Sequence, residues 1–140
     1  MSLSRLTIYA VASGMLVLAS PLGAHHSQRP FYDYGLWVEI EGTVNRFNFG
    51  NPHPVLYLEV AEPNGETVEW KLLFPPAAVL MRRGWTAEQF VPGEVITARG
   101  HPSRQPGTHG MARLTIARSD GTVVFRSGGG ASSELVSPLR

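Results

Sequence analysis

Hydrophobic and polar residues alternate in three consecutive segments of the chain, residues 37–47, 55–60 and 68–74. Alternation with a period of two is typical of strands that bury one face. Gly42, inside the first segment, predicts a bend or a bulge at that point. The Asn64-Gly65 pair between the second and third segments predicts a hairpin turn, because these residues adopt positive φ angles readily. We therefore expect three antiparallel strands joined as a meander.

The period changes after Pro75-Pro76. Residues 77–83 are mostly good helix formers and are followed by Gly84, a pattern that predicts a short helix. Residues 86–89 (TAEQ) then match a capping box, flanked by aromatic residues at the positions of a hydrophobic staple. A single helical segment is therefore expected after the third strand.

Strand-like segments resume at residues 94–100, 111–118 and 122–125, and a polar loop over residues 101–110 separates the first two. A helix between the third and fourth strands is the arrangement of OB folds, whose ligands bind strands two and three and the loops after strands one and four. We therefore predict an all-β fold with one short helix, a small OB-like barrel of five to six strands. A different small barrel or a β-sandwich is the structural alternative. A parallel sheet is excluded because helical segments do not alternate with strands.

The N-terminal segment has the features of a secretory signal peptide. Arg5 precedes an uncharged apolar stretch, residues 8–19, that is too short to span a bilayer. The following residues offer a proline break and a small residue, so cleavage is expected after Ala24. An uncleaved anchor is the alternative. We expect a periplasmic or secreted protein with no stable membrane anchor after cleavage.

These signals divide the 140 residues into a signal peptide (1–24), one OB-like barrel domain (25–126) and a flexible Gly/Ser-rich tail (127–140). The chain contains no cysteine, which excludes disulfides, thiolate metal sites and a cysteine nucleophile. Its formal net charge is only +1, which disfavours nucleic-acid binding.

Five histidines are the candidate metal ligands: His25, His26, His53, His101 and His109. Cleavage after Ala24 would make His25 the first residue, and its free amine and imidazole could chelate one metal ion as a histidine brace. His53 follows Asn51-Pro52 in a stiff turn after the first strand, while the last two histidines fall in the loop after the fourth strand. Imidazole and amine nitrogens suit Cu(II), so copper, or another divalent metal, is the expected ligand. The structural alternative is that His53 holds its turn through a hydrogen bond to a backbone carbonyl.

No catalytic residue is predicted, because no serine has the context of a nucleophile elbow. Trp70 and Trp85 fit the pattern of the core, whereas Trp37 is the aromatic residue left open for stacking. Three functions remain open. They are a metal-binding module, a metal-free module that docks a protein partner of the cell envelope through a tryptophan- and tyrosine-bearing N-terminal arm and the barrel face, and, least supported, a mono-copper oxidase built on His25.

Four short motifs occur together in the chain, namely residues 24–27 (AHHS), 51–53 (NPH), 80–86 (LMRRGWT) and 92–94 (PGE). Their combination resembles an uncharacterised family of small exported bacterial proteins that is known only as a domain of unknown function. The resemblance covers nearly all of residues 25–140. It implies a periplasmic single domain without an assigned activity, substrate or cofactor. Its motifs include His25, His26 and His53 but not the other two histidines.

Overall fold

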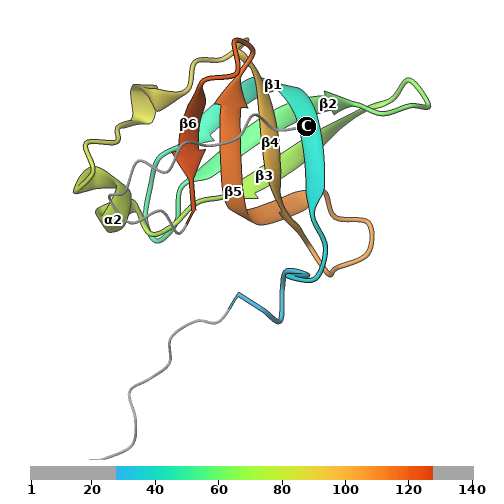
Figure 1. Ribbon diagram of the computed structural model, residues 1–140, viewed down its shortest axis with the longest axis horizontal. Coiled ribbons are helices and arrows are strands. Elements are labelled where there is room, and N and C mark those ends of the chain that lie inside the picture. The colour runs from blue at the N-terminus through green and yellow to red at the C-terminus, as the bar shows by residue number, and fades with distance from the viewer. Residues whose placement is uncertain (1–27, 128–140) are drawn as a thin grey trace, which may run out of the picture.

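The structure, a computed structural model, describes residues 28–127, which form a β-barrel with one short helix (Figure 1). The predicted signal peptide and its cleavage site, His25 and His26, and residues 128–140 of the predicted tail lie outside the described residues. Six strands are present: β1 (Val38–Asn48), β2 (Val55–Ala61), β3 (Thr67–Leu73), β4 (Val95–Pro102), β5 (Gly110–Arg118) and β6 (Val123–Arg126). Between β3 and β4 the chain forms helix α2 (Ala77–Met81) and the 3-10 turn η1 (Ala87–Gln89).

The barrel is closed by five strands. Antiparallel pairs join β1 to β2, β2 to β3, β1 to β4 and β4 to β5, and a parallel pairing of β3 with β5 completes the ring. The sixth strand, β6, pairs only with the second half of β5 and extends the sheet beyond the barrel. With a helix between β3 and β4, this confirms the predicted OB-like barrel.

Strand β1 takes part in two pairings and bends between them. Residues 38–43 pair with β4, whereas residues 43–48 pair with β2. The predicted bend at Gly42 is therefore confirmed, and the bulge of this strand lies beyond it, between Val44 and Arg46. At the bend, a Cβ atom added to Gly42 would lie 2.8 Å from the backbone oxygen of Glu59, so only glycine allows this approach.

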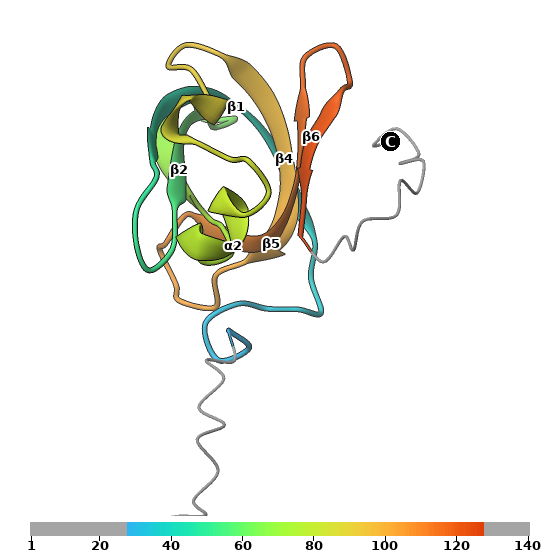
Figure 2. The ribbon, with the colours of Figure 1, turned by 90° about the vertical axis from the view of Figure 1, so that its left-hand side faces the viewer.

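Helix α2 is shorter than the predicted residues 77–83. It ends in a Schellman motif, in which the N–H of Gly84 bonds to the Met81 carbonyl and the N–H of Trp85 bonds to the Leu80 carbonyl. Gly84 has a φ of 79°, as the predicted C-terminal glycine requires. The expected capping box begins only a single 3-10 turn, and Thr86 makes no capping bond there. Together α2 and η1 cover one end of the barrel (Figure 2).

The core fills the barrel beneath this covered end. Phe74 is 1% exposed, and its ring packs against Phe47, Trp85, Phe90 and Phe125 at centroid distances of 4.7–6.0 Å. Aliphatic side chains from all five barrel strands continue this cluster: Val44, Leu56, Leu58, Leu72, Ile96, Leu114 and Ile116. Trp70 and Trp85 pack against it, as the sequence predicts. Within residues 28–127, no helix has the length and hydrophobicity needed to cross a membrane.

Candidate functional site

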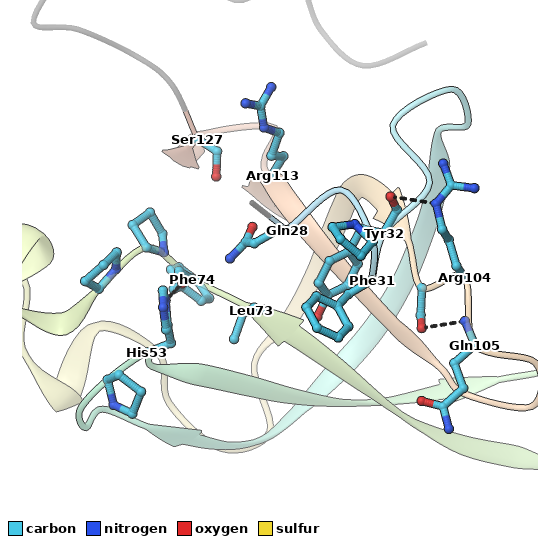
Figure 3. A pocket seen from close by; sticks show the side chains of 15 residues that line it. Gln28, Phe31, Tyr32, His53, Leu73, Phe74, Arg104, Gln105, Arg113 and Ser127 are labelled. Atoms are coloured by element: carbon cyan, nitrogen blue, oxygen red, sulfur yellow. Dashed lines mark hydrogen bonds between the residues drawn. The ribbon is translucent and has the colours of Figure 1, made fainter. Parts of the chain in front are cut away.

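A cavity of about 1020 Å³ opens where the N-terminal arm, residues 28–37, passes the ends of β3 and β5 (Figure 3). We call it the arm cavity. The lining comes from the arm, from the end of β3 and the chain after it, from the β1–β2 and β4–β5 loops, from β5, and from the residue after β6. The lining residues are Gln28, Pro30, Phe31, Tyr32, Pro52, His53, Leu73, Phe74, Pro75, Pro76, Ser103, Arg104, Gln105, Arg113 and Ser127. The cavity therefore joins two of the regions that bind ligands in OB folds.

His53 enters this cavity from a turn that begins with a cis peptide bond between Asn51 and Pro52. Its Nδ1 lies 2.8 Å from the backbone oxygen of Phe74. A carbonyl can only accept, so Nδ1 is the donor, and the lone pair of a neutral imidazole is then on Nε2. The predicted hydrogen bond that holds the turn is thus confirmed. The same bond orients the ring in the way that metal-binding histidines require, because they donate their second nitrogen to a carbonyl or carboxylate.

His101 does not lie in the predicted loop. Strand β4 continues past Gly100, and His101 pairs with Ala112 of β5 and is 5% exposed. The loop prediction was wrong because the sequence after Gly100 is polar and resembles a loop, although His101 and Pro102 still pair with β5. The His101 ring lies 3.9 Å from Trp37 and 4.9 Å from Tyr34, and its Nδ1 donates to the Leu36 carbonyl at 2.7 Å. Its contacts therefore attach the arm to the barrel.

His109 lies just before β5, in the loop, as predicted. Its ring meets Trp70 at a centroid distance of 5.4 Å, while the Trp70 Nε1 is buried without a hydrogen-bond partner in the described part of the chain. Trp70 and Phe74, the contacts of His109 and His53, are four residues apart along one extended segment, a separation of roughly 13 Å. The two imidazoles therefore belong to different regions.

The three candidate ligands that the structure describes, His53, His101 and His109, thus do not converge. Among residues 28–127, no three histidine or acidic side chains form a group that could hold a metal ion. A metal site that includes His53 needs ligands from outside this range, and the sequence offers His25 and His26 there.

Two arginines on the cavity wall were not among the predicted site residues. The Arg104 side chain binds the arm: its Nε donates to the carbonyls of Arg29 and Tyr32, and its Nη2 lies 3.0 Å from the Asp33 carboxylate. Arg113 adopts a φ of 54°, the one positive φ of a non-glycine residue in the described chain, and its guanidinium lies 4.8 Å from the centre of the Tyr34 ring. No motif in the sequence marks either residue.

Arg113 is placed by a bulge in β5. Arg99 pairs with Thr115 and His101 with Ala112, so β5 contains one more residue than β4 between these pairs. The irregularity leaves Arg113 exposed between the buried Ala112 and Leu114. Bulges commonly re-aim a side chain next to a binding site. The alternation of polar and apolar residues along β5 predicts that the Arg113 side chain points outward. It does not predict the positive φ of the Arg113 backbone.

Tyr32 adds a neutral hydroxyl group to the lining. Burial raises the pKa of the Tyr32 phenol above its usual value, and the neighbouring Tyr34 raises it further. The phenol therefore keeps its proton at neutral pH and can donate a hydrogen bond.

The family model of DUF6152, a family of unknown function, matches residues 12–113. The chain belongs to DUF6152. The predicted resemblance to a domain of unknown function is confirmed. The matched segment contains His53 and ends at Arg113. No curated protein and no solved structure matches this DUF6152 chain.

Proposed function

We propose that this DUF6152 protein is an exported binding module that holds a divalent metal ion, copper in the first place, at the arm cavity. The ligands are the Nε2 of His53 and the nitrogens of His25 and His26. One observation carries the proposal: Gln28 and His53 line the same cavity. The periplasmic or secreted location follows from the signal-peptide pattern of residues 1–24 and belongs to the proposal.

The reach of the chain supports this ligand set. His25 precedes Gln28 by three residues, so its Cα lies within about 11 Å of the Gln28 Cα, since one residue spans at most about 3.3–3.6 Å. In Figure 3, Gln28 stands between His53 and Arg113. A histidine that follows the arm back toward the cavity can therefore approach the free nitrogen of His53.

Substituting His53 with asparagine tests the metal site. The asparagine amide can still donate to the Phe74 carbonyl and hold the turn, but it lacks the lone pair of Nε2. We expect the variant to fold with a nearly unchanged Tm and to bind Cu(II) at least about tenfold more weakly than the wild type, because one of few ligands is lost. Isothermal titration of the processed protein and the d–d absorption of bound Cu(II) measure this.

Two controls separate the ligands. His109→Ala, which removes an imidazole facing Trp70, should leave the affinity for Cu(II) unchanged. In a protein extended by one residue before His25, the amine of His25 becomes a peptide nitrogen. Its contribution to the affinity for Cu(II) should then be lost. If His53→Asn binds Cu(II) as tightly as the wild type, His53 only holds the turn and the proposed site is wrong.

A metal-free docking module is the second candidate, and the arm is the feature that favours it. Phe31, Leu36 and Trp37 are 66%, 57% and 53% exposed. Exposed apolar residues close together mark protein interaction sites. Under this function, Trp37→Ala abolishes co-purification of an envelope partner after crosslinking, whereas His53→Asn does not; the metal proposal expects no such dependence on Trp37.

A further inference from the structure

We infer that the arm cavity also binds a small organic anion, whose carboxylate or phosphate group is held by Arg113. This inference does not depend on the metal proposal, since it rests on the opposite wall of the cavity and needs no residue outside the described chain. We infer the class of anion from the charge of the cavity lining, the backbone geometry of Arg113 and the chemistry of the other lining residues.

The charged side chains of the lining are all positive. They are Arg104 and Arg113, and none of the lining residues is aspartate or glutamate. The charge of Arg104 is balanced by Asp33, with which it forms an ion pair at 3.0 Å. Within residues 28–127, the Arg113 guanidinium has neither a carboxylate partner nor a hydrogen bond, and it lies over the Tyr34 ring. Arg113 therefore contributes an uncompensated positive charge to the cavity wall.

The stacking on Tyr34 prepares this group for an anion. A guanidinium that rests its face on an aromatic ring still presents its N–H groups along the edge, where they can bind a carboxylate or phosphate in bidentate fashion. The ring also restricts the long side chain, which lowers the entropy lost on binding. Ser127, which lines the same cavity, can supply a further donor.

The backbone of Arg113 indicates that the side chain has a role. Its φ of 54° lies in the left-handed region, where a non-glycine residue is strained. Glycine would satisfy the bulge better at this position. This position suits glycine, and the arginine found there forms no ion pair. A ligand that binds its guanidinium would explain why the residue is arginine.

The apolar part of the cavity lining indicates what the rest of the ligand is, beyond its anionic group. Prolines at positions 30, 52, 75 and 76, together with Phe31 and Leu73, give most of the lining an apolar character. An inorganic anion would leave these walls in contact with water. A compact anion with an apolar or aromatic body buries them, and this gain adds to the charge-assisted hydrogen bonds at Arg113.

Arg113→Gly is the decisive variant, because it removes the guanidinium and at the same time relieves the backbone strain. The metal-free processed protein, kept in chelator, is titrated with phenyl phosphate and benzoate, with benzamide as the neutral analogue of benzoate and inorganic phosphate as the bare anion. We expect saturable 1:1 binding of both organic anions to the wild type, weakened about tenfold or more in Arg113→Gly, while the Tm of the variant is unchanged or higher.

Arg99→Ala is the matched control. Arg99 also stacks on an aromatic residue, Trp37, at 5.1 Å, but it is not part of the cavity lining. Its loss should leave the affinity for phenyl phosphate unchanged. Equal binding of benzamide and benzoate, equal binding of phenyl and inorganic phosphate, an unchanged affinity in Arg113→Gly, or no binding of either organic anion at millimolar concentration would each overturn the inference. Because no metal is present, none of these results bears on His53.

Discussion

Replacing Phe74 with alanine is expected to lower the free energy of unfolding by about 3–5 kcal/mol, the usual cost of deleting a buried phenylalanine. Phe74 is 1% exposed and contacts four other aromatic rings, so the variant leaves a cavity that several rigid side chains cannot fill. A domain of this size has a total stability of about 5–15 kcal/mol, and the loss is therefore a large fraction of it. Urea denaturation followed by tryptophan fluorescence measures the change.

Phe31→Ala is the control for this variant. Phe31 is the same residue type but is 66% exposed on the arm, so its removal should change the stability by no more than about 0.5 kcal/mol. Equal effects of the two substitutions would contradict the arrangement in which Phe74 is the centre of the core.

Gly42→Ala is expected to lower the stability by about 1–3 kcal/mol, although it adds only one methyl group. The new Cβ would lie 2.8 Å from the Glu59 backbone oxygen and 2.8 Å from the Val60 Cγ2 atom. A backbone oxygen in a sheet cannot rotate away, so β1 and β2 would have to separate where β1 bends. A lower urea midpoint with an unchanged m-value is the expected signature.

The control is Gly50→Ala in the turn after β1. A Cβ at Gly50 would meet nothing within 4 Å, and this glycine has no positive φ. The substitution restricts the unfolded chain and should leave the stability unchanged or raise it by about 0.4–1 kcal/mol. A Gly42→Ala protein as stable as Gly50→Ala would show that β1 and β2 are not in close contact at the bend.

Much of the fold is predictable from the sequence because the signals are local. Alternation identified β1, β2 and β3 to within one residue, and Gly84 correctly marked the end of the helical segment. The turn after β2 was predicted less well: Gly65 has a positive φ, but Asn64 does not, and its side chain accepts a hydrogen bond from the Glu66 N–H instead.

The site was less predictable because it depends on contacts between distant segments. The burial of His101 results from a ladder with β5 and from an arm 65 residues away, to which its Nδ1 donates. The φ of Arg113 results from a difference in residue number between two paired strands, which no local pattern records. The hydrogen bond of His53, in contrast, was anticipated, because a stiff turn next to a strand end leaves few acceptors within reach.

The pairing pattern of the strands also affects how folded molecules behave at high concentration. In the described chain, β5 pairs with β3 over its first residues and with β6 over its last, so the barrel has no continuous open side. The outer strands of the sheet are the four-residue β6, which pairs on one side only, and β3, whose first half has no partner on its outer side. Exposed charged residues, Arg126 and Glu69, lie on these two short edges. Short charged edges resist strand addition by a second molecule, which protects this barrel against aggregation through its sheet.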